Sequence, residues 1–137
     1  MFKRILVPID LSDRNRRTLR AALELARRGR ARVTLLHVIQ SVEKLPPAEL
    51  GDFYRRLTAV SSRKLDRAAK PFARGLRVRT EVCIGEPARE IIRVSLRDRA
   101  DLIVMGSHKV RPDRAPHWGT TSYKVGIFCQ CPILLVK

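Results

Sequence analysis

A glycine and hydroxyl cluster follows a short apolar run in the last third of the chain. The run, Leu102–Met105, has the length of a strand and β-branched residues at its centre, and Gly106 ends it. After a polar loop, a helical stretch opens on the residues Gly119, Thr120, Thr121 and Ser122. The free N–H groups and the dipole of a helix start both favour an anion. The cluster therefore predicts a phosphate cradle, and the alternative interpretation is an ordinary turn with a hydroxyl N-cap.

Runs of strand length and helical stretches alternate along the chain, and they would position this cluster. We expect strands at residues 3–9, 32–39, 76–84, 102–105 and 132–136, and helices at about 14–28, 48–73, from 87 onward and 120–128. This order predicts an α/β layer with a mostly parallel sheet and right-handed crossovers. Such sheets bind ligands beyond the carboxyl ends of their strands, where the strand order reverses. Asp10 and Gly106 each follow such an end.

The strand at 76–84 differs from the others in its pattern. Its apolar face is formed by the alternating residues Leu76, Val78, Thr80, Val82 and Ile84. The strands at 3–9 and 32–39 are instead apolar on both faces, which is typical of strands covered on both sides. A period of two marks one solvated face, so the strand at 76–84 is expected at an edge of the sheet.

Apolar residues at helical spacing predict the face that each helix buries. In the helix at 14–28 they are Leu19, Ala22, Leu23 and Ala26. In the helix at 48–73 they are Leu50, Phe53, Leu57, Val60, Leu65, Ala68 and Phe72. In the helix from 87 they are Ala88, Ile91, Ile92, Ser95 and Leu96. Gly29 is expected to cap the first helix. Gly126 costs the last helix about 1 kcal/mol relative to alanine, which indicates a close packing contact there.

The composition indicates a single domain over residues 1–137. The chain is 45% hydrophobic but only 5% aromatic, so its core is expected to be aliphatic. No apolar run approaches the roughly 20 residues that a membrane span needs. The first residues become polar too quickly for a secretory signal, so a cytoplasmic location with no membrane partner is expected.

The net charge of the chain is +16, from 29 Lys and Arg against 13 Asp and Glu. Such an excess favours phosphate ligands, nucleic acid or anionic membranes, and a solvated basic surface is an equally weighted interpretation. Arg14, Arg16 and Arg17 stand near the start of a helix, where cations oppose the helix dipole. Their position indicates a surface selected for something besides stability.

The three cysteines and His37 do not form a recognisable disulfide or metal-binding pattern in the sequence. Cys83, Cys129 and Cys131 do not make a disulfide framework. The C-x-C pair lacks a second pair of metal ligands, so buried, reduced thiols and no metal site are expected. His37 lies within a strand and is expected to be a core or near-core histidine, although it could touch a ligand at the strand's end.

The chain contains the segments ILVPIDLSD, LLHVI, IGEPAREII, DLIVMGSH and CPILLVK, spread over nearly its whole length. Together they resemble the universal stress protein family. ATP-binding members of that family carry the pattern G-x2-G-x9-G-[ST] after their fourth strand, and Gly106, Gly119 and Thr120 match it. Lys109 stands where the family has its second glycine, which would let the backbone approach phosphate closely. A lysine there either replaces that contact with a charge or obstructs the loop.

The resemblance implies a doubly wound sheet of order 3-2-1-4-5 with four helices, and a ligand crevice between the first and fourth strands. It implies ATP in this crevice, with Asp10 at the ribose and the backbone near Val38 at the adenine. The residues implied around the phosphates are Gly106, Lys109, Gly119, Thr120, Thr121 and Ser122. Pro8 and Met105 would form walls. Mg²⁺ is compatible with such a site but has no dedicated ligand set in the sequence.

The last strand, Pro132–Val136, is apolar on both faces. Natural proteins normally cover or blunt an apolar edge of this kind. The resemblance implies a family that usually dimerises, often through this final strand. We therefore expect a homodimer with the two Pro132–Val136 strands side by side.

The leading hypothesis is an ATP-binding, homodimeric stress-response protein that acts as a regulatory module. His108 and His117 could act as acid or base, but no nucleophile accompanies them, so no catalytic residue is predicted and slow ATP hydrolysis is the most that is expected. The alternative is a dimeric interaction module that has lost nucleotide binding and uses its basic surface to bind acidic proteins or nucleic acid. Nucleic acid has the weaker support, because no known motif is present and aromatic side chains are few.

Overall fold

The computed structural model describes residues 1–41, 47–107 and 120–137 of the chain. Its strands are β1 (Arg4–Pro8), β2 (Arg32–Gln40), β3 (Arg77–Gly85), β4 (Leu102–Gly106) and β5 (Ile133–Val136). Its helices are α1 (Arg16–Gly29), α2 (Pro47–Ala69), α3 (Pro87–Arg97) and α4 (Thr121–Phe128). The strands form one parallel sheet in the order β3-β2-β1-β4-β5. The expected order 3-2-1-4-5 is confirmed, and the strand order reverses between β1 and β4.

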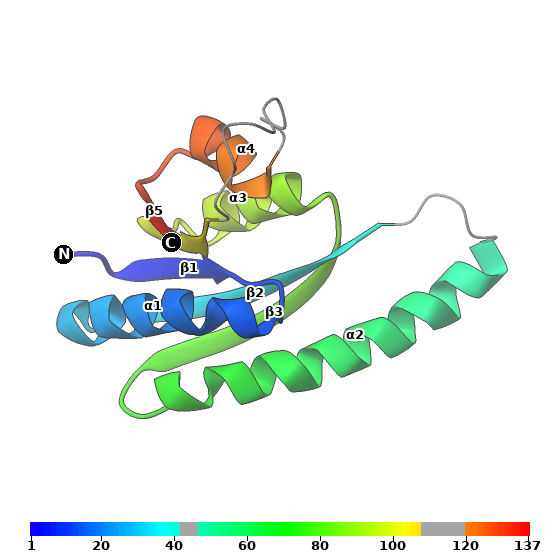
Figure 1. Cartoon of the computed structure of the whole chain (residues 1–137), viewed down its shortest axis with the longest axis horizontal. Helices are drawn as coiled ribbons and strands as arrows, with labels where there is room; N and C mark the ends of the chain where they lie inside the picture. The colour runs from blue at the N-terminus through cyan, green and yellow to red at the C-terminus, as the bar shows by residue number, and fades with distance from the viewer. Residues whose placement is uncertain (42–46, 108–119) are drawn as a thin grey trace.

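Helices cover both faces of the sheet (Figure 1), with α1 and α2 on one face and α3 and α4 on the other. Successive residues of β1 point into alternate layers. Ile5 and Val7 belong to the layer of α1 and α2, and Leu6 belongs to the layer of α3 and α4. These three side chains are 2%, 0% and 1% exposed. Burying one aliphatic side chain contributes about 1.5–3 kcal/mol, so the pattern of β1 fixes it at the centre of the sheet.

The strand β3 lies at an edge of the sheet, as its alternation predicted. The alternation holds in its first part, where Arg77 and Arg79 are exposed. The expectation of one solvated face is wrong further along, because Glu81 and Cys83 are half-buried and Ile84 is 41% exposed. Cys83 packs against the layer of α3, which covers this part of the strand. The same burial raises the pKa of the Cys83 thiol.

The predicted buried faces of two helices need correction. In α2 the expected stripe holds at Leu65, which is fully buried, but Phe53 and Val60 are 41% and 40% exposed. The start of α2 extends past the ends of the strands in Figure 1, so the sheet does not lie beneath this part of the helix. In α3 the expected Leu96 is 49% exposed, and Val94 is fully buried instead.

Two glycines have roles other than those expected. Gly29 is the last residue of α1 rather than its cap, because Arg30 adopts the left-handed conformation (φ 51°) and donates its N–H to the carbonyl of Arg27. A Cβ on Gly29 would lie 2.6 Å from the carbonyl oxygen of Phe2, so this position needs glycine for space. A Cβ on Gly126 would meet no described atom within 4 Å, so the close contact expected in α4 is not found there.

Substituting these two glycines by alanine is expected to change the free energy of unfolding in opposite directions. Gly29→Ala drives a methyl group into backbone and should lower it by about 1–3 kcal/mol. Gly126→Ala adds a better helix former in open space and should raise it by about 0.5–1 kcal/mol. Urea denaturation of both variants beside the parent chain measures this. Equal effects of the two substitutions would contradict the packing described here.

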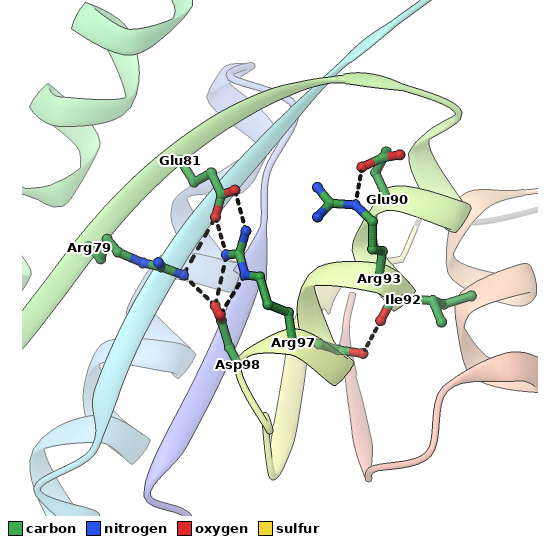
Figure 2. A network of polar contacts seen from close by, with 8 residues as sticks. Arg79, Glu81, Glu90, Ile92, Arg93, Arg97 and Asp98 are labelled. Atoms are coloured by element: carbon green, nitrogen blue, oxygen red, sulfur yellow. Dashed lines mark hydrogen bonds and ion pairs between the residues drawn. The ribbon is translucent and has the colours of Figure 1, made fainter.

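An ion-pair network joins β3 to the end of α3 (Figure 2). The guanidinium of Arg97 donates to both carboxylate oxygens of Glu81, at 2.8 and 2.5 Å, and its Nε donates to Asp98 at 2.8 Å. Arg79 also donates to Asp98 and lies 3.5 Å from Glu81. Hydrogen bonds from Arg97 hold the pKa of Glu81 and the pKa of Asp98 below their usual values. The network thereby ties the end of α3 to the edge strand.

This network is expected to make the stability of the fold depend on acid. Glu81 and Asp98 bind protons less tightly in the folded chain than in the unfolded chain, whose carboxyls have the usual pKa values of 4.5 and 3.8. Their stabilisation is therefore complete above those values and is lost as the pH falls through the lower pKa values of the folded chain. Arg97→Gln should lower the free energy of unfolding by about 1 kcal/mol at neutral pH, because partial exposure screens these charges.

Denaturation of Arg97→Gln and of the parent chain over a series of pH values, from neutral to acid, measures this. The variant should lose less stability in acid than the parent chain does. Arg93→Gln is the matched control, because Arg93 makes no hydrogen bond to Glu81 or Asp98. Its guanidinium pairs with Glu90 on the same helix and also interacts with Cys83. An acid dependence of Arg97→Gln as steep as that of the parent chain would contradict the role assigned to the network.

Candidate functional site

A cavity of about 620 Å³ opens at the carboxyl edge of the sheet, where β1, β2 and β4 end and α4 begins. Its volume is typical of small-molecule sites. Its walls contain every predicted site residue that the structure describes, namely Pro8, Asp10, Val38, Met105, Gly106, Thr120, Thr121 and Ser122. The predicted residues Lys109 and Gly119 lie outside the described part of the chain, as do His108 and His117.

The turn after β1 fixes the carboxylate of Asp10. Its Oδ1 accepts hydrogen bonds from the N–H of Ser12 at 2.9 Å, from the Ser12 hydroxyl at 2.6 Å and from Nδ2 of Asn15 at 2.6 Å. Asn15 is buried, so one of these donors is anchored in the core. Leu11, which lies between Asp10 and Ser12 in the chain, adopts the left-handed backbone conformation (φ 65°). This conformation costs a non-glycine residue about 1–3 kcal/mol. The turn thus holds strained backbone beside the cavity.

The end of β4 is closely packed. A Cβ on Gly106 would lie 3.2 Å from the hydroxyl oxygen of Thr18, which is 1% exposed on α1. The N–H of the next residue, Ser107, donates to the carbonyl of Val136 at 2.9 Å. Gly106 therefore lets α1 approach the strand end, while β5 holds the chain beyond it. The small residue leaves its backbone open toward the cavity.

The start of α4 shows the N-cap that was one interpretation of the hydroxyl cluster, and the phosphate cradle stays a prediction. The hydroxyl of Thr120 accepts from the N–H of Tyr123 at 3.3 Å, so Thr120 is the N-cap. It also lies 3.4 Å from the hydroxyl of Ser122. The first amides of a helix have no partner within the helix, and its dipole is positive at this end.

Two arginines that were not among the predicted site residues line the same cavity. Arg14 and Arg17 lie just before and within the first turn of α1. The guanidinium of Arg17 donates to the carbonyl of Lys137 at 3.3 Å. The signal for them was present in the sequence, because cations at a helix start oppose the dipole. Both side chains therefore add positive charge to the cavity wall.

His37 has a hydrogen-bond partner for its Nδ1 and also lines the cavity. Its Nδ1 lies 2.9 Å from the carbonyl oxygen of Ile9, and a carbonyl only accepts, so Nδ1 carries the proton. The half-buried ring lines the cavity beside Val38. The expectation of a near-core histidine is therefore correct, and the ring still faces the ligand space at the end of β2.

In the described ranges, the thiols and acidic groups form no metal site and no disulfide. All three cysteines are free and half-buried. The Cys129 thiol lies 3.3 Å from the carbonyl of Cys131, and burial raises the pKa of Cys131. No group of three His, Cys, Asp or Glu residues in the described ranges could hold a metal ion. Among the described helices, none combines the length and the apolar composition that crossing a bilayer requires.

A doubly wound parallel sheet with a small-molecule cavity at its switch of strand order defines the class of the fold. The model of the universal stress protein family matches residues 1–137, and the chain belongs to this family. A universal stress protein of Thermus aquaticus is 32% identical over the full length of both chains.

Two solved structures extend the comparison. The hypothetical protein MJ0577 is 27% identical and superposes with a TM-score of 0.87, and the match covers 100% of this chain and 96% of that protein. A universal stress protein from Archaeoglobus fulgidus, solved in complex with dAMP, is 20% identical with a TM-score of 0.70 over 98% of both chains. At this identity, the similarity to the Archaeoglobus fulgidus protein shows a shared fold.

Proposed function

We propose that the chain binds an adenine nucleotide, ATP, in the cavity at the ends of β1 and β4, and that it acts as a regulatory stress-response module. The observation that carries this proposal is the convergence of separate segments on one cavity. The end of β1, the second half of β2, the end of β4 and the start of α4 all contribute walls. The binding of dAMP by a relative of the same fold supports an adenine nucleotide as the ligand.

The wall residues have the chemistry that the parts of ATP require. The carboxylate of Asp10 is held in place and can accept hydrogen bonds from ribose hydroxyls. The backbone near Val38 would bind the adenine. The start of α4 would bind the phosphates through backbone amides and hydroxyls. Arg14, Arg17 and Lys109 would add positive charge. Gly119 would also lie at the phosphates. Mg²⁺ would be held by the phosphates rather than by a dedicated protein ligand set.

Binding rather than catalysis is proposed. A general acid or base needs a partner that it activates, and the described wall offers His37 with its Nδ1 engaged by a backbone carbonyl. Asp10 Oδ1 is likewise engaged by donors of its own turn. Both groups are arranged to position a ligand. Slow ATP hydrolysis is the most that we expect of the chain.

Calorimetric titration with Mg-ATP at physiological salt tests the nucleotide proposal. GTP and inorganic triphosphate are run alongside, because a chain of net charge +16 attracts any polyanion. We expect ATP to bind at least about tenfold more tightly than either control, a difference of about 1.4 kcal/mol. Equal binding of the three anions, fading as salt is added, would leave the interaction module as the function.

A pair of carboxylate substitutions localises the binding. Asp10→Asn should weaken ATP binding by about tenfold, since a neutral amide is a poorer acceptor for ribose hydroxyls than a carboxylate. Asp13→Asn makes the same change of charge three residues away, outside the cavity wall, and should leave ATP binding unchanged. If the two variants bind ATP equally, Asp10 does not contact the nucleotide.

We also propose that two copies associate through their β5 strands. This edge strand carries Leu134 and Leu135, which are 39% and 37% exposed. The end of α4, which precedes β5 in the chain, adds Ile127 at 55% and Phe128 at 66% exposure. An apolar edge with unpaired backbone groups favours pairing with another strand. A second copy of the chain supplies a matching strand.

Light scattering at micromolar concentration is expected to give twice the chain mass of 15.7 kDa. Leu134→Lys should shift the mass toward that of one chain, because a charge in a paired apolar edge is costly. Val60→Lys, at an equally exposed position on α2, should leave the mass at two chains. A parent chain that scatters as a single copy would contradict the association.

A further inference from the structure

A second cavity, of about 560 Å³, lies at the opposite edge of the sheet from the proposed nucleotide site. It is formed where β1, β2 and β3 begin, beside the turn that follows α3, and its wall includes Arg4, Arg32, Thr34, Arg77, Arg79 and Asp98. It shares no lining residue with the first cavity. Along β1 the lining of the second cavity ends at Leu6 and that of the first begins at Pro8, a rise of about 7 Å over two residues.

Three of these arginines stand side by side. Arg4 is the register partner of Arg32, and Arg32 is the register partner of Arg77. Neighbouring strands lie about 4.8 Å apart, and like charges directly opposite each other across a strand pair are destabilising. Within the described ranges, no hydrogen bond or ion pair is found for the side chains of these three residues. We call Arg4, Arg32 and Arg77 the arginine row.

The acidic groups nearest to the arginine row are already engaged. Asp101 uses its carboxylate oxygens to accept from the backbone N–H groups of Lys3 and Arg4, at 2.8 and 3.0 Å. Asp98, in the cavity wall, accepts from Arg79 and Arg97, and Figure 2 shows it turned toward both. The cavity wall therefore carries four arginines against one aspartate, a formal excess of +3.

We propose that this second cavity is a binding site for a small ligand that carries two or more phosphate groups. A phosphate group bears a charge of about −1.5 to −2 at neutral pH, so two such groups would offset the excess of the wall. Guanidinium groups bind phosphate oxygens bidentately, and a row of them matches linked phosphates better than one isolated ion. The hydroxyl of Thr34 adds a neutral donor on the same wall.

The composition of the wall favours a small anion over a nucleic-acid strand. Proteins that bind single strands combine a basic groove with aromatic side chains on which bases stack. The cavity wall contains aliphatic and polar residues beside its arginines and no aromatic side chain among the described residues. Binding of such a ligand would account for part of the net charge of +16.

The test is a titration of the ¹⁵N-labelled full chain with inorganic pyrophosphate, followed by amide resonances at an ionic strength of about 0.15 M. The amides of residues 32–34 and 77–79 should shift along one saturating curve. Orthophosphate should need about tenfold higher concentration for the same shift, because it engages fewer guanidinium groups. Resonances of residues 104–107 and 120–122 report on the proposed nucleotide site separately, so failure at one cavity is distinguishable from failure at the other.

Matched charge substitutions complete the experiment. Arg32→Gln should weaken pyrophosphate binding by about tenfold, while Arg56→Gln, an exposed arginine of α2 outside the cavity wall, should weaken it less than about twofold. Arg77→Gln on the edge strand is a second variant in case Arg32→Gln folds poorly. Asp10→Asn should leave pyrophosphate binding at the arginine row unchanged.

Three results would overturn the proposal. The first is an equal effect of Arg32→Gln and Arg56→Gln, which would mean bulk electrostatic attraction. The second is a pyrophosphate titration without saturation at residues 32–34. The third is displacement of pyrophosphate by a short single-stranded DNA at much lower phosphate concentration, which would assign the arginine row to nucleic acid.

Discussion

The burial of β1 on both faces is the constraint on which the rest of the structure depends. Because Ile5, Leu6 and Val7 are all buried, helices must cover both sides of the sheet and strands must flank β1 on both edges. Parallel neighbours require the chain to leave the sheet at the same edge after every strand. Turns, helix starts and the glycine at the end of β4 therefore gather at one edge, and the strand starts gather at the other.

The ligands proposed at these two edges would be held by different means. At the carboxyl edge the positive potential would come from the backbone amides at the start of α4, with Arg14 and Arg17 nearby. At the amino edge it comes from side chains, because Arg4, Arg32 and Arg77 share one row across three strands. The first arrangement suits a ligand with distinct parts to be oriented. The second suits a dense anion of simple shape.

Much of this arrangement could be predicted from the sequence, and the exceptions have physical causes. The sheet order, the edge position of β3 and eight of the cavity residues followed from local patterns and from family resemblance. The exposure of Phe53 did not, because helical spacing carries no information on where the sheet beneath a helix ends. Arg14 was missed as a site residue because the sequence does not show which helix starts border the cavity. The arginine row was missed because strand register is a property of the folded chain. The role of Gly29 likewise depends on Phe2, which is distant in sequence.

The two edge strands of the sheet differ in a way that bears on how far association can proceed. The strand β5 presents apolar side chains at its edge, whereas β3 presents Arg77 and Arg79. Charged side chains on an edge strand discourage further strands from adding to it. A contact between two β5 strands is symmetric and uses up both apolar edges. Association would then stop at the dimer, because both outer edges of the joined sheet are β3 strands with exposed arginines that repel each other. Open-ended fibres are therefore disfavoured.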